Sequence, residues 1–258
     1  MRAIITGAAS GIGRAVAEQL NAESLQQSGE PAKLVLADWS SAALEEASSA
    51  LRDAGAQVVP ILADLGDPAK SGEIVEAARL NFGGLDGLVS NAGILHRVDL
   101  LDMTLEQYDQ SFAINTRPTF LLGKAAYPLL KESQGAIVAT TSIAAHEPTP
   151  SLGAYSPSKA ALLMLVRQMA CAWGPDGIRA NTVSPGATRT GIGRPDGKPR
   201  PASEMKGKNP LGKVAEPEEQ AAAIVFLLGP KASYITGADL VVDGGLRTQL
   251  MTLRDRQP

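Results

Sequence analysis

The chain has 258 residues, of which 44% are apolar and 20% are charged, and its formal net charge is -3. This length and composition fit a single domain over residues 1–258 and exclude a disordered or collagen-like chain. The slight negative charge supplies no basic field for a phosphate backbone, which argues against nucleic acid as the main partner.

Cys171 is the single cysteine, which excludes an internal disulfide and suggests a reducing compartment. We expect its side chain to be buried packing within an apolar run. The N-terminus lacks the layout of a signal peptide, and the longest apolar runs are too short to cross a bilayer. These features predict a cytoplasmic protein with no membrane partner.

Short β-branched and apolar runs alternate with longer segments of helical period, the pattern of βαβ units around a parallel sheet. We predict seven strands, near 2–6, 33–38, 56–62, 86–90, 135–141, 178–183 and 238–242. Helices are predicted between them, near 12–27, 40–54, 68–82, 104–131, 155–173 and 217–228. The predicted fold class is α/β, with a single Rossmann-type doubly wound parallel sheet and helices on both faces.

The segment 187–213 breaks this alternation, because it is rich in Gly, Pro, Lys and Arg. We interpret it as a lid. Between 187 and 208 its acidic residues are Asp196 and Glu204, and its basic residues are Arg189, Arg194, Lys198, Arg200, Lys206 and Lys208. This surplus of positive charge leaves two interpretations open: recognition of an anionic substrate, or a solvated loop that offsets the acidic body.

A glycine-rich turn follows the first predicted strand and opens the first predicted helix. It reads Thr6-Gly7-Ala8-Ala9-Ser10-Gly11-Ile12-Gly13. Glycines let the backbone turn sharply and approach a pyrophosphate, whose charge is favoured by a helix N-terminus. Because strand, turn and helix occur together, we interpret the turn as a dinucleotide site rather than a merely structural turn.

Asp38 ends the second predicted strand, where its carboxylate could accept hydrogen bonds from the adenosine ribose hydroxyls. The alternative is a helix N-cap. Trp39, the next residue, could shelter the adenine edge or cap the sheet, and both interpretations stay open.

A second motif is Tyr155-Ser156-Pro157-Ser158-Lys159, with Ser142 thirteen residues before the tyrosine. Residues four apart on a helix share a face, so Tyr155 and Lys159 can reach one another or one ligand. A nearby ammonium stabilises a phenolate, so we expect Lys159 to lower the pKa of Tyr155. Ser142 could then hold a substrate oxygen in line with the phenol.

These motifs resemble those of the short-chain dehydrogenase/reductase superfamily, in the subgroup with a TGxxxGxG turn and a YxxxK active site. The resemblance covers the chain from Arg2 to about Leu246 and implies a nicotinamide cofactor. It implies cofactor contacts at Thr6, Gly7, Ser10, Gly11, Ile12, Gly13, Asp38, Trp39, Asp64, Leu65, Asn91, Ala92, Gly93, Tyr155, Lys159, Pro185, Gly186, Thr188 and Thr190.

The resemblance also implies the activity, which is hydride transfer between NAD(H) and a secondary alcohol or ketone. Tyr155 would be the general acid/base, Lys159 would also bind the nicotinamide ribose, and Ser142 would polarise the substrate oxygen. Asn115 would anchor a water-based proton relay. A homotetramer or homodimer is implied, with the helices near 104–131 and 155–173 as contacts.

Two alternatives remain. One is an NADP(H)-linked reductase of the 3-oxoacyl type, and the other is a cofactor-sensing regulator without catalysis. The regulator is disfavoured because Tyr155 and Lys159 are both present. We favour NAD(H) because Asp38 would repel a 2′-phosphate, and because Ser10 and Trp39 stand where the NADP-binding relatives usually carry Arg or Lys. Arg14 at the start of the first helix could offset that repulsion.

Ser90-Asn91 stands where the family usually has an Asn-Asn pair, which leaves the backbone contacts of the first position open. His96 and His146 could approach the substrate end of the cleft, although we favour solvated loop positions for both. With only two histidines in the chain, we predict no metal site.

Overall fold

The computed structural model describes residues 1–193, 199 and 209–249. Its sheet has seven parallel strands in the order β3-β2-β1-β4-β5-β6-β7. Their bounds are β1 (Arg2–Thr6), β2 (Lys33–Asp38), β3 (Gln57–Leu62), β4 (Gly87–Ser90), β5 (Ala136–Thr140), β6 (Arg179–Pro185) and β7 (Asp239–Val242). This doubly wound order confirms the predicted Rossmann-type α/β fold class.

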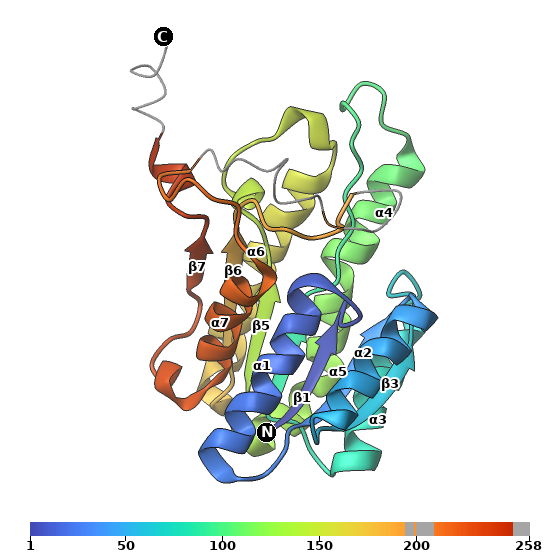
Figure 1. The fold of residues 1–258 in the computed structure, drawn as a ribbon. Coiled ribbons are helices and arrows are strands. Elements are labelled where there is room, and N and C mark those ends of the chain that lie inside the picture. Colours follow the sequence, from blue (N-terminus) through green and yellow to red (C-terminus); the bar gives the residue numbers. More distant parts are fainter. Residues whose placement is uncertain (194–198, 200–208, 250–258) are drawn as a thin grey trace.

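Helices cover both faces of the sheet (Figure 1). Their bounds are α1 (Gly11–Ser28), α2 (Ser41–Asp53), α3 (Ala69–Phe82), α4 (Leu105–Asn115), α5 (Arg117–Ser133), α6 (Tyr155–Trp173) and α7 (Pro217–Leu228). The helices α1, α2 and α7 contribute to one apolar cluster, whereas α3, α5 and α6 contribute to a second cluster on the opposite face.

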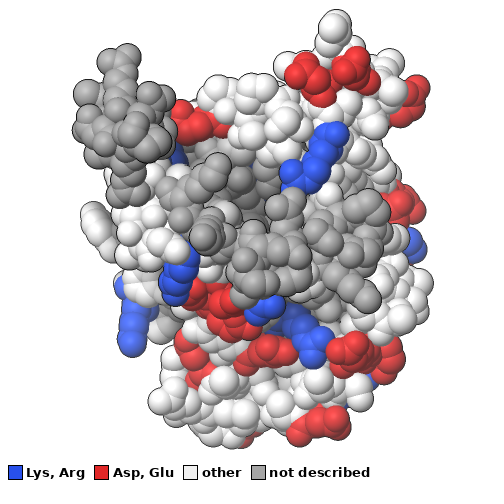
Figure 2. Space-filling model, turned by 45° about the horizontal axis from the view of Figure 1, so that its top comes forward, with Lys and Arg blue, Asp and Glu red and all other residues white. Residues whose placement is uncertain are grey.

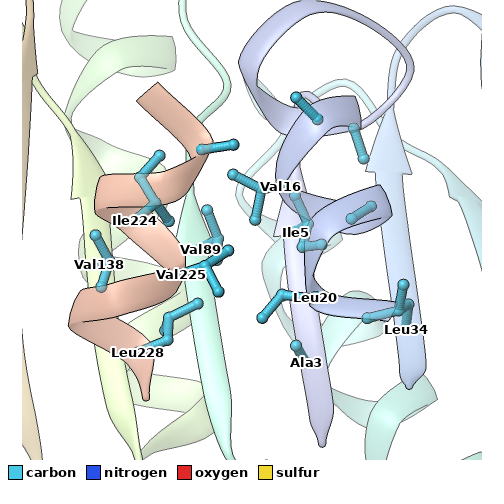
Figure 3. Close-up of a cluster of buried hydrophobic side chains, with 14 of the residues drawn as sticks. Ala3, Ile5, Val16, Leu20, Leu34, Val89, Val138, Ile224, Val225 and Leu228 are labelled. Atoms are coloured by element: carbon cyan, nitrogen blue, oxygen red, sulfur yellow. The ribbon is translucent and has the colours of Figure 1, made fainter. Parts of the chain in front are cut away.

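The first of these clusters joins α1 and α7 to the middle of the sheet. In Figure 3, Val16 and Leu20 of α1 and Val225 of α7 belong to one cluster with Ile5 and Val89 of the sheet. Each of these side chains is at most 3% exposed. Burying a side chain of this kind contributes about 1.5–3 kcal/mol, so the cluster fixes where α1 begins relative to β1.

The prediction of one helix over 104–131 was wrong, because α4 and α5 are separate helices that meet at Thr116. Thr116 has φ -125° and ψ -55°, outside helical geometry, and its hydroxyl donates to the carbonyl of Ser158 at 2.8 Å. Pro118 has no N–H and cannot continue the helical hydrogen bonds of α4. The break places Asn115 at the last position of α4.

Cys171 is exposed, so the expectation of a buried cysteine was also wrong. The buried face of α6 contains Leu162, Val166 and Met169, which recur every three or four residues. Cys171 comes two residues after Met169 and therefore projects from the opposite side of the helix.

The two ends of the predicted lid lie together. Thr188 pairs with Ala215 in a parallel bridge, and the amide of Arg189 donates to the carbonyl of Ala215 at 2.9 Å. The positions 194–198 and 200–208 of that segment, with Arg194, Lys198, Arg200, Lys206 and Lys208, lie outside the described residues.

Candidate functional site

The candidate site lies at the carboxyl edge of the sheet, at the top of Figure 1, where the strands end and several helices begin. Thr6 ends β1, Ser90 ends β4 and Thr140 ends β5, while Tyr155 begins α6. In open parallel sheets ligands bind at this edge, beside the point where the strand order reverses. Here that point lies between β1 and β4.

Tyr155 and Lys159 lie together in the first turns of α6, as predicted. Lys159 is 2% exposed, and its Nζ donates to the carbonyl of Thr140 at 2.8 Å. The same Nζ lies 5.9 Å from the centroid of the Tyr155 ring. A positive charge placed beside a tyrosine ring favours the phenolate over the phenol.

The pKa of Tyr155 is nevertheless raised. Burial, which penalises the phenolate, is the larger cause, and a hydrogen bond with Ser142 acts in the opposite direction. Burial also lowers the pKa of Lys159 to about 8. The expected lowering of the pKa of Tyr155 is therefore not found in the protein alone, because desolvation of the phenolate outweighs the hydrogen bond with Ser142.

Ser142 is 9% exposed and caps a one-turn helix, η1 (Ile143–Ala145). Its Oγ accepts a hydrogen bond from the amide of Ala144 at 3.1 Å. The hydroxyl therefore has a fixed place beside Tyr155, with its proton available for an oxygen acceptor.

Asn115 is buried and connects α4 to the active-site turn of α6. Its Oδ1 accepts from the amide of Ile94 at 2.8 Å, and its Nδ2 donates to the hydroxyl of Ser158 at 3.0 Å. Ser158 in turn donates to the carbonyl of Tyr155 at 2.8 Å. Ser158 was not among the predicted site residues, because nothing in its local sequence separates a buried serine from a solvated one in a first turn.

The turn at 91–93 packs on the end of β1. The amides of Asn91 and Ala92 both donate to Thr6 Oγ1, at 3.0 and 3.1 Å, and Asn91 Oδ1 accepts from Thr140 Oγ1 at 3.0 Å. Ser90, the unusual residue before this motif, pairs its hydroxyl with Thr119 of α5 at 2.7 Å. The departure from the family pattern therefore has a packing role between β4 and α5.

The glycine-rich turn fits a dinucleotide. A Cβ on Gly13 would lie 2.1 Å from the carbonyl oxygen of Gly7, and Gly7 and Gly11 have φ of 64° and 53°. Other residues rarely adopt this backbone. Among the described residues, the side chain of Ser10 makes no capping hydrogen bond to α1, and the first turn carries no acidic group. This N-terminus can therefore receive an anionic phosphate.

Asp38 and Trp39 lie where the adenosine end of the cofactor is predicted to bind. Asp38 accepts hydrogen bonds from the amides of Ala9 and Ser40, both at 3.0 Å, so its carboxylate joins the glycine-rich turn to the start of α2. Trp39 is 80% exposed and does not cap the sheet. Arg14 is paired with two glutamates, Glu18 at 3.0 Å and Glu46 at 2.9 Å.

Two further predicted contacts follow β3. Asp64 is exposed and accepts from the amide of Gly66 at 2.8 Å, whereas the side chain of Leu65 is 6% exposed. Asp64 therefore shapes the loop after β3 within the protein itself.

The predicted cofactor contacts after β6 lie close to the glycine-rich turn. A Cβ on Gly11 would lie 3.2 Å from the methyl group of Thr190, and Thr188 Oγ1 donates to the carbonyl of Gly186 at 3.1 Å. Gly186 follows Pro185 at the end of β6 and packs tightly on Asp243. Residues far apart in the sequence are therefore brought to one edge.

The comparisons with known proteins agree with this geometry. A family model described as enoyl-(acyl carrier protein) reductase matches residues 7–247. The chain is 35% identical to 2-(S)-hydroxypropyl-CoM dehydrogenase 3 of Xanthobacter autotrophicus over 248 residues, covering 94% of each chain. It is 36% identical to L-rhamnose 1-dehydrogenase (NAD(P)(+)) of Azotobacter vinelandii over 254 residues, covering 96% of each. The chain belongs to the short-chain dehydrogenase/reductase family.

A solved structure of a short-chain type dehydrogenase/reductase from Mycobacterium marinum matches with a TM-score of 0.84 and 33% identity, covering 95% of this chain and 94% of that one. As a short-chain dehydrogenase/reductase with dehydrogenases among its relatives, the protein is an oxidoreductase.

The favoured interpretation of His146 as a solvated loop residue was wrong. His146 ends η1, and its Nε2 lies 2.7 Å from a carboxylate oxygen of Asp239. His96 is half-buried, and its Nε2 is buried with no hydrogen-bond partner among the described residues. Asp239, the first residue of β7, reaches the ring of His146 from a segment 93 residues away.

Arg189 is the described member of the basic lid set, and it is already neutralised. Its guanidinium contacts both carboxylate oxygens of Glu216, with the shortest distance 2.6 Å. Figure 2 tilts the upper edge of the molecule forward, and on the face in view basic side chains lie interspersed with acidic ones. Arg189 therefore does not support the anionic-substrate hypothesis.

Within residues 1–193, 199 and 209–249, no helix combines the length and apolar character needed to cross a membrane. In the same residues, no group of three or more His, Cys, Asp or Glu side chains could hold a metal ion.

Proposed function

We propose that the protein moves a hydride between NAD(H) and a secondary alcohol or ketone, with Tyr155 as general acid/base. The observation that carries this proposal is the buried Lys159 held beside the ring of Tyr155. The hydroxyl of Ser142 forms a hydrogen bond with the side chain of the same tyrosine. The dehydrogenase relatives support it. When bound, the nicotinamide supplies the hydride acceptor or donor.

The polar residues of the site then have defined tasks. In the oxidation direction, the hydroxyl proton of the substrate passes to the phenolate of Tyr155, while Ser142 holds the same oxygen by a hydrogen bond. Lys159 stabilises the phenolate and would also hold the ribose hydroxyls of the cofactor. Asn115 fixes Ser158 and so the first turn of α6, and it would anchor the water that returns the proton to solvent.

A substrate screen tests this proposal. Secondary alcohols, hydroxy acids, sugars and steroids would be offered with NAD+, and the corresponding ketones with NADH, while the absorbance of the reduced cofactor is followed. We expect turnover with at least one secondary alcohol or its ketone. Cofactor binding without turnover of any of them would favour the regulator instead.

We also propose that NAD(H) is preferred over NADP(H). At about 5 Å and an effective dielectric near 20, the repulsion between Asp38 and a phosphate charge is on the order of 3 kcal/mol, roughly a hundredfold in affinity. Arg14, the candidate for offsetting this repulsion, is engaged by Glu18 and Glu46. A relative named as NAD(P)-dependent indicates that both cofactors occur in the family. The proposed preference of this protein for NAD(H) therefore rests on Asp38 and on the pairing of Arg14.

Asp38→Ala combined with Trp39→Arg is expected to shift the ratio of kcat/KM for the two cofactors towards NADP(H) by about tenfold or more. The control is Asp53→Ala, which removes the same charge at the opposite end of α2. Steady-state kinetics with each cofactor at fixed substrate measures the ratio. A parent enzyme that already prefers NADP(H) would refute the role of Asp38 and favour the 3-oxoacyl-type alternative.

We propose a homodimer or homotetramer built on α4, α5 and α6. Apolar side chains on these helices are unusually exposed, with Tyr108 at 43%, Phe120 at 45% and Met164 at 60%. Exposed large apolar side chains on helices that pack against one another support an interaction surface there. Light scattering at micromolar concentration is expected to give a dimer or tetramer mass, and Phe120→Lys with Met164→Glu to lower it. A monomeric parent would contradict this prediction.

A further inference from the structure

A buried polar cluster lies beside Ser142, between β5, β6 and β7, and the roles proposed above do not use it. At its centre is Asp239, the first residue of β7, whose side chain is 4% exposed. One carboxylate oxygen accepts from the hydroxyls of Thr182 at 2.5 Å and Ser184 at 2.9 Å. The other lies 2.7 Å from Nε2 of His146.

The carboxylate of Asp239 determines which groups of this cluster donate. A carboxylate only accepts, so Ser184 donates to Asp239, and Nε2 of His146 carries the proton that faces it. Ser184 Oγ also lies 2.7 Å from Thr141 Oγ1, whose own proton is donated to the carbonyl of Val183 at 2.9 Å. Asp239 therefore holds Ser184 and His146 together, while Thr141 is bonded to β6 through the carbonyl of Val183.

Thr141 and His146 flank Ser142 in the sequence. Thr141 directly precedes it, and His146 ends η1, the single turn that Ser142 caps. Within this turn, the amide of Ala145 donates to the carbonyl of Ser142 at 2.9 Å and that of His146 to Ile143 at 3.0 Å. A turn this short is not stable by itself, so its position depends on what anchors its ends. The carbonyl of Val183 in β6 accepts from the amide of Thr141 at 2.8 Å before the turn, and Asp239 holds His146 after it.

We propose that His146, through Asp239, is a positioning residue for Ser142. It holds η1 against β7, so that the hydroxyl of Ser142 keeps its place beside Tyr155. A displacement of about 1 Å in a reacting group can cost about a hundredfold in rate, so the anchor matters for turnover without touching the substrate. This inference rests on the proposed function, in which Ser142 binds the substrate oxygen.

The first test needs no substrate. Hydrogen exchange would be measured for the amides of residues 143–147 in the parent protein and in three variants. His146→Ala removes the anchor, and His146→Gln keeps a donor for Asp239. Glu147→Gln is the matched control, since the carboxylate of Glu147 forms a more exposed ion pair with Arg247 at 3.2 Å. We expect exchange to speed up at least about tenfold in His146→Ala alone.

The second test is a double-mutant cycle on turnover. His146→Ala is expected to lower kcat by about ten- to a hundredfold, with the dissociation constant of NAD(H) within about twofold and with recovery in His146→Gln. In a Ser142→Ala background the same substitution is expected to change kcat by less than about twofold, because the group it positions is gone.

The outcomes separate the two proposals. Absence of turnover in the parent refutes the proposed function, while the exchange measurement still decides whether His146 holds the turn. Unchanged exchange in His146→Ala, or equal losses of kcat in the parent and Ser142→Ala backgrounds, overturns the positioning role.

Discussion

Tyr155→Phe is expected to lower turnover by about two or more orders of magnitude and to leave the dissociation constant of NAD(H) almost unchanged. The substitution removes only the hydroxyl that exchanges a proton with the substrate, and positioned proton transfer contributes about 10²- to 10⁴-fold. The ring stays, so the contact with Lys159 and the packing at the start of α6 are kept. Steady-state kinetics and cofactor titration by tryptophan fluorescence measure the two quantities.

Tyr234→Phe is the matched control, because it deletes the same hydroxyl from a fully exposed tyrosine outside the candidate site. Its turnover is expected to equal that of the parent. A Tyr155→Phe enzyme that works at near-normal speed would refute the assignment of the general acid/base.

Lys159→Ala is expected to lose turnover and cofactor affinity together. Turnover falls because the phenolate of Tyr155, already disfavoured by burial, loses the charge that stabilises it. Affinity falls because the same ammonium is proposed to hold the ribose hydroxyls. A variant that loses only one of the two properties would show that they do not share this side chain, and kcat measured beside the dissociation constant of NAD(H) distinguishes these results.

Lys159→Met tests whether such a loss comes from unfolding. Burial lowers the pKa of Lys159 from 10.5 to about 8, which corresponds to about 3 kcal/mol of destabilisation of the folded state at neutral pH. Removing the charge relieves that cost, while the lost bond to the carbonyl of Thr140 costs about 1–3 kcal/mol. The free energy of unfolding at pH 7 is therefore expected to change by no more than about 2 kcal/mol.

The same pKa gives a sign for the pH dependence of stability. Between about pH 8 and 10.5 the unfolded chain keeps the proton of Lys159 and the folded protein releases it. Stability contributed by this group therefore rises with pH across that window. Chemical unfolding at several pH values is expected to show this rise in the parent and a weaker one in Lys159→Met.

The fold was largely predictable because its signals are local. Apolar runs bounded by turn residues placed β1 at Arg2–Thr6 and β2 at Lys33–Asp38, and helical period with Pro217 in a first turn placed α7 at Pro217–Leu228. The cofactor turn was predictable for the same reason, since glycine is required wherever the backbone takes a positive φ or packs without a Cβ.

The sequence by itself therefore determined the α/β class, the order of the elements and the motif that brings Tyr155 and Lys159 to one helix face. Only the tertiary structure decided the rest. The hydroxyl of Thr116 is held by the carbonyl of Ser158, and the ring of His146 by Asp239, 93 residues away. The raised pKa of Tyr155 depends on burial. Hydrogen bonds between distant segments and the loss of water around a side chain exist only once the chain has folded, and no local pattern encodes them.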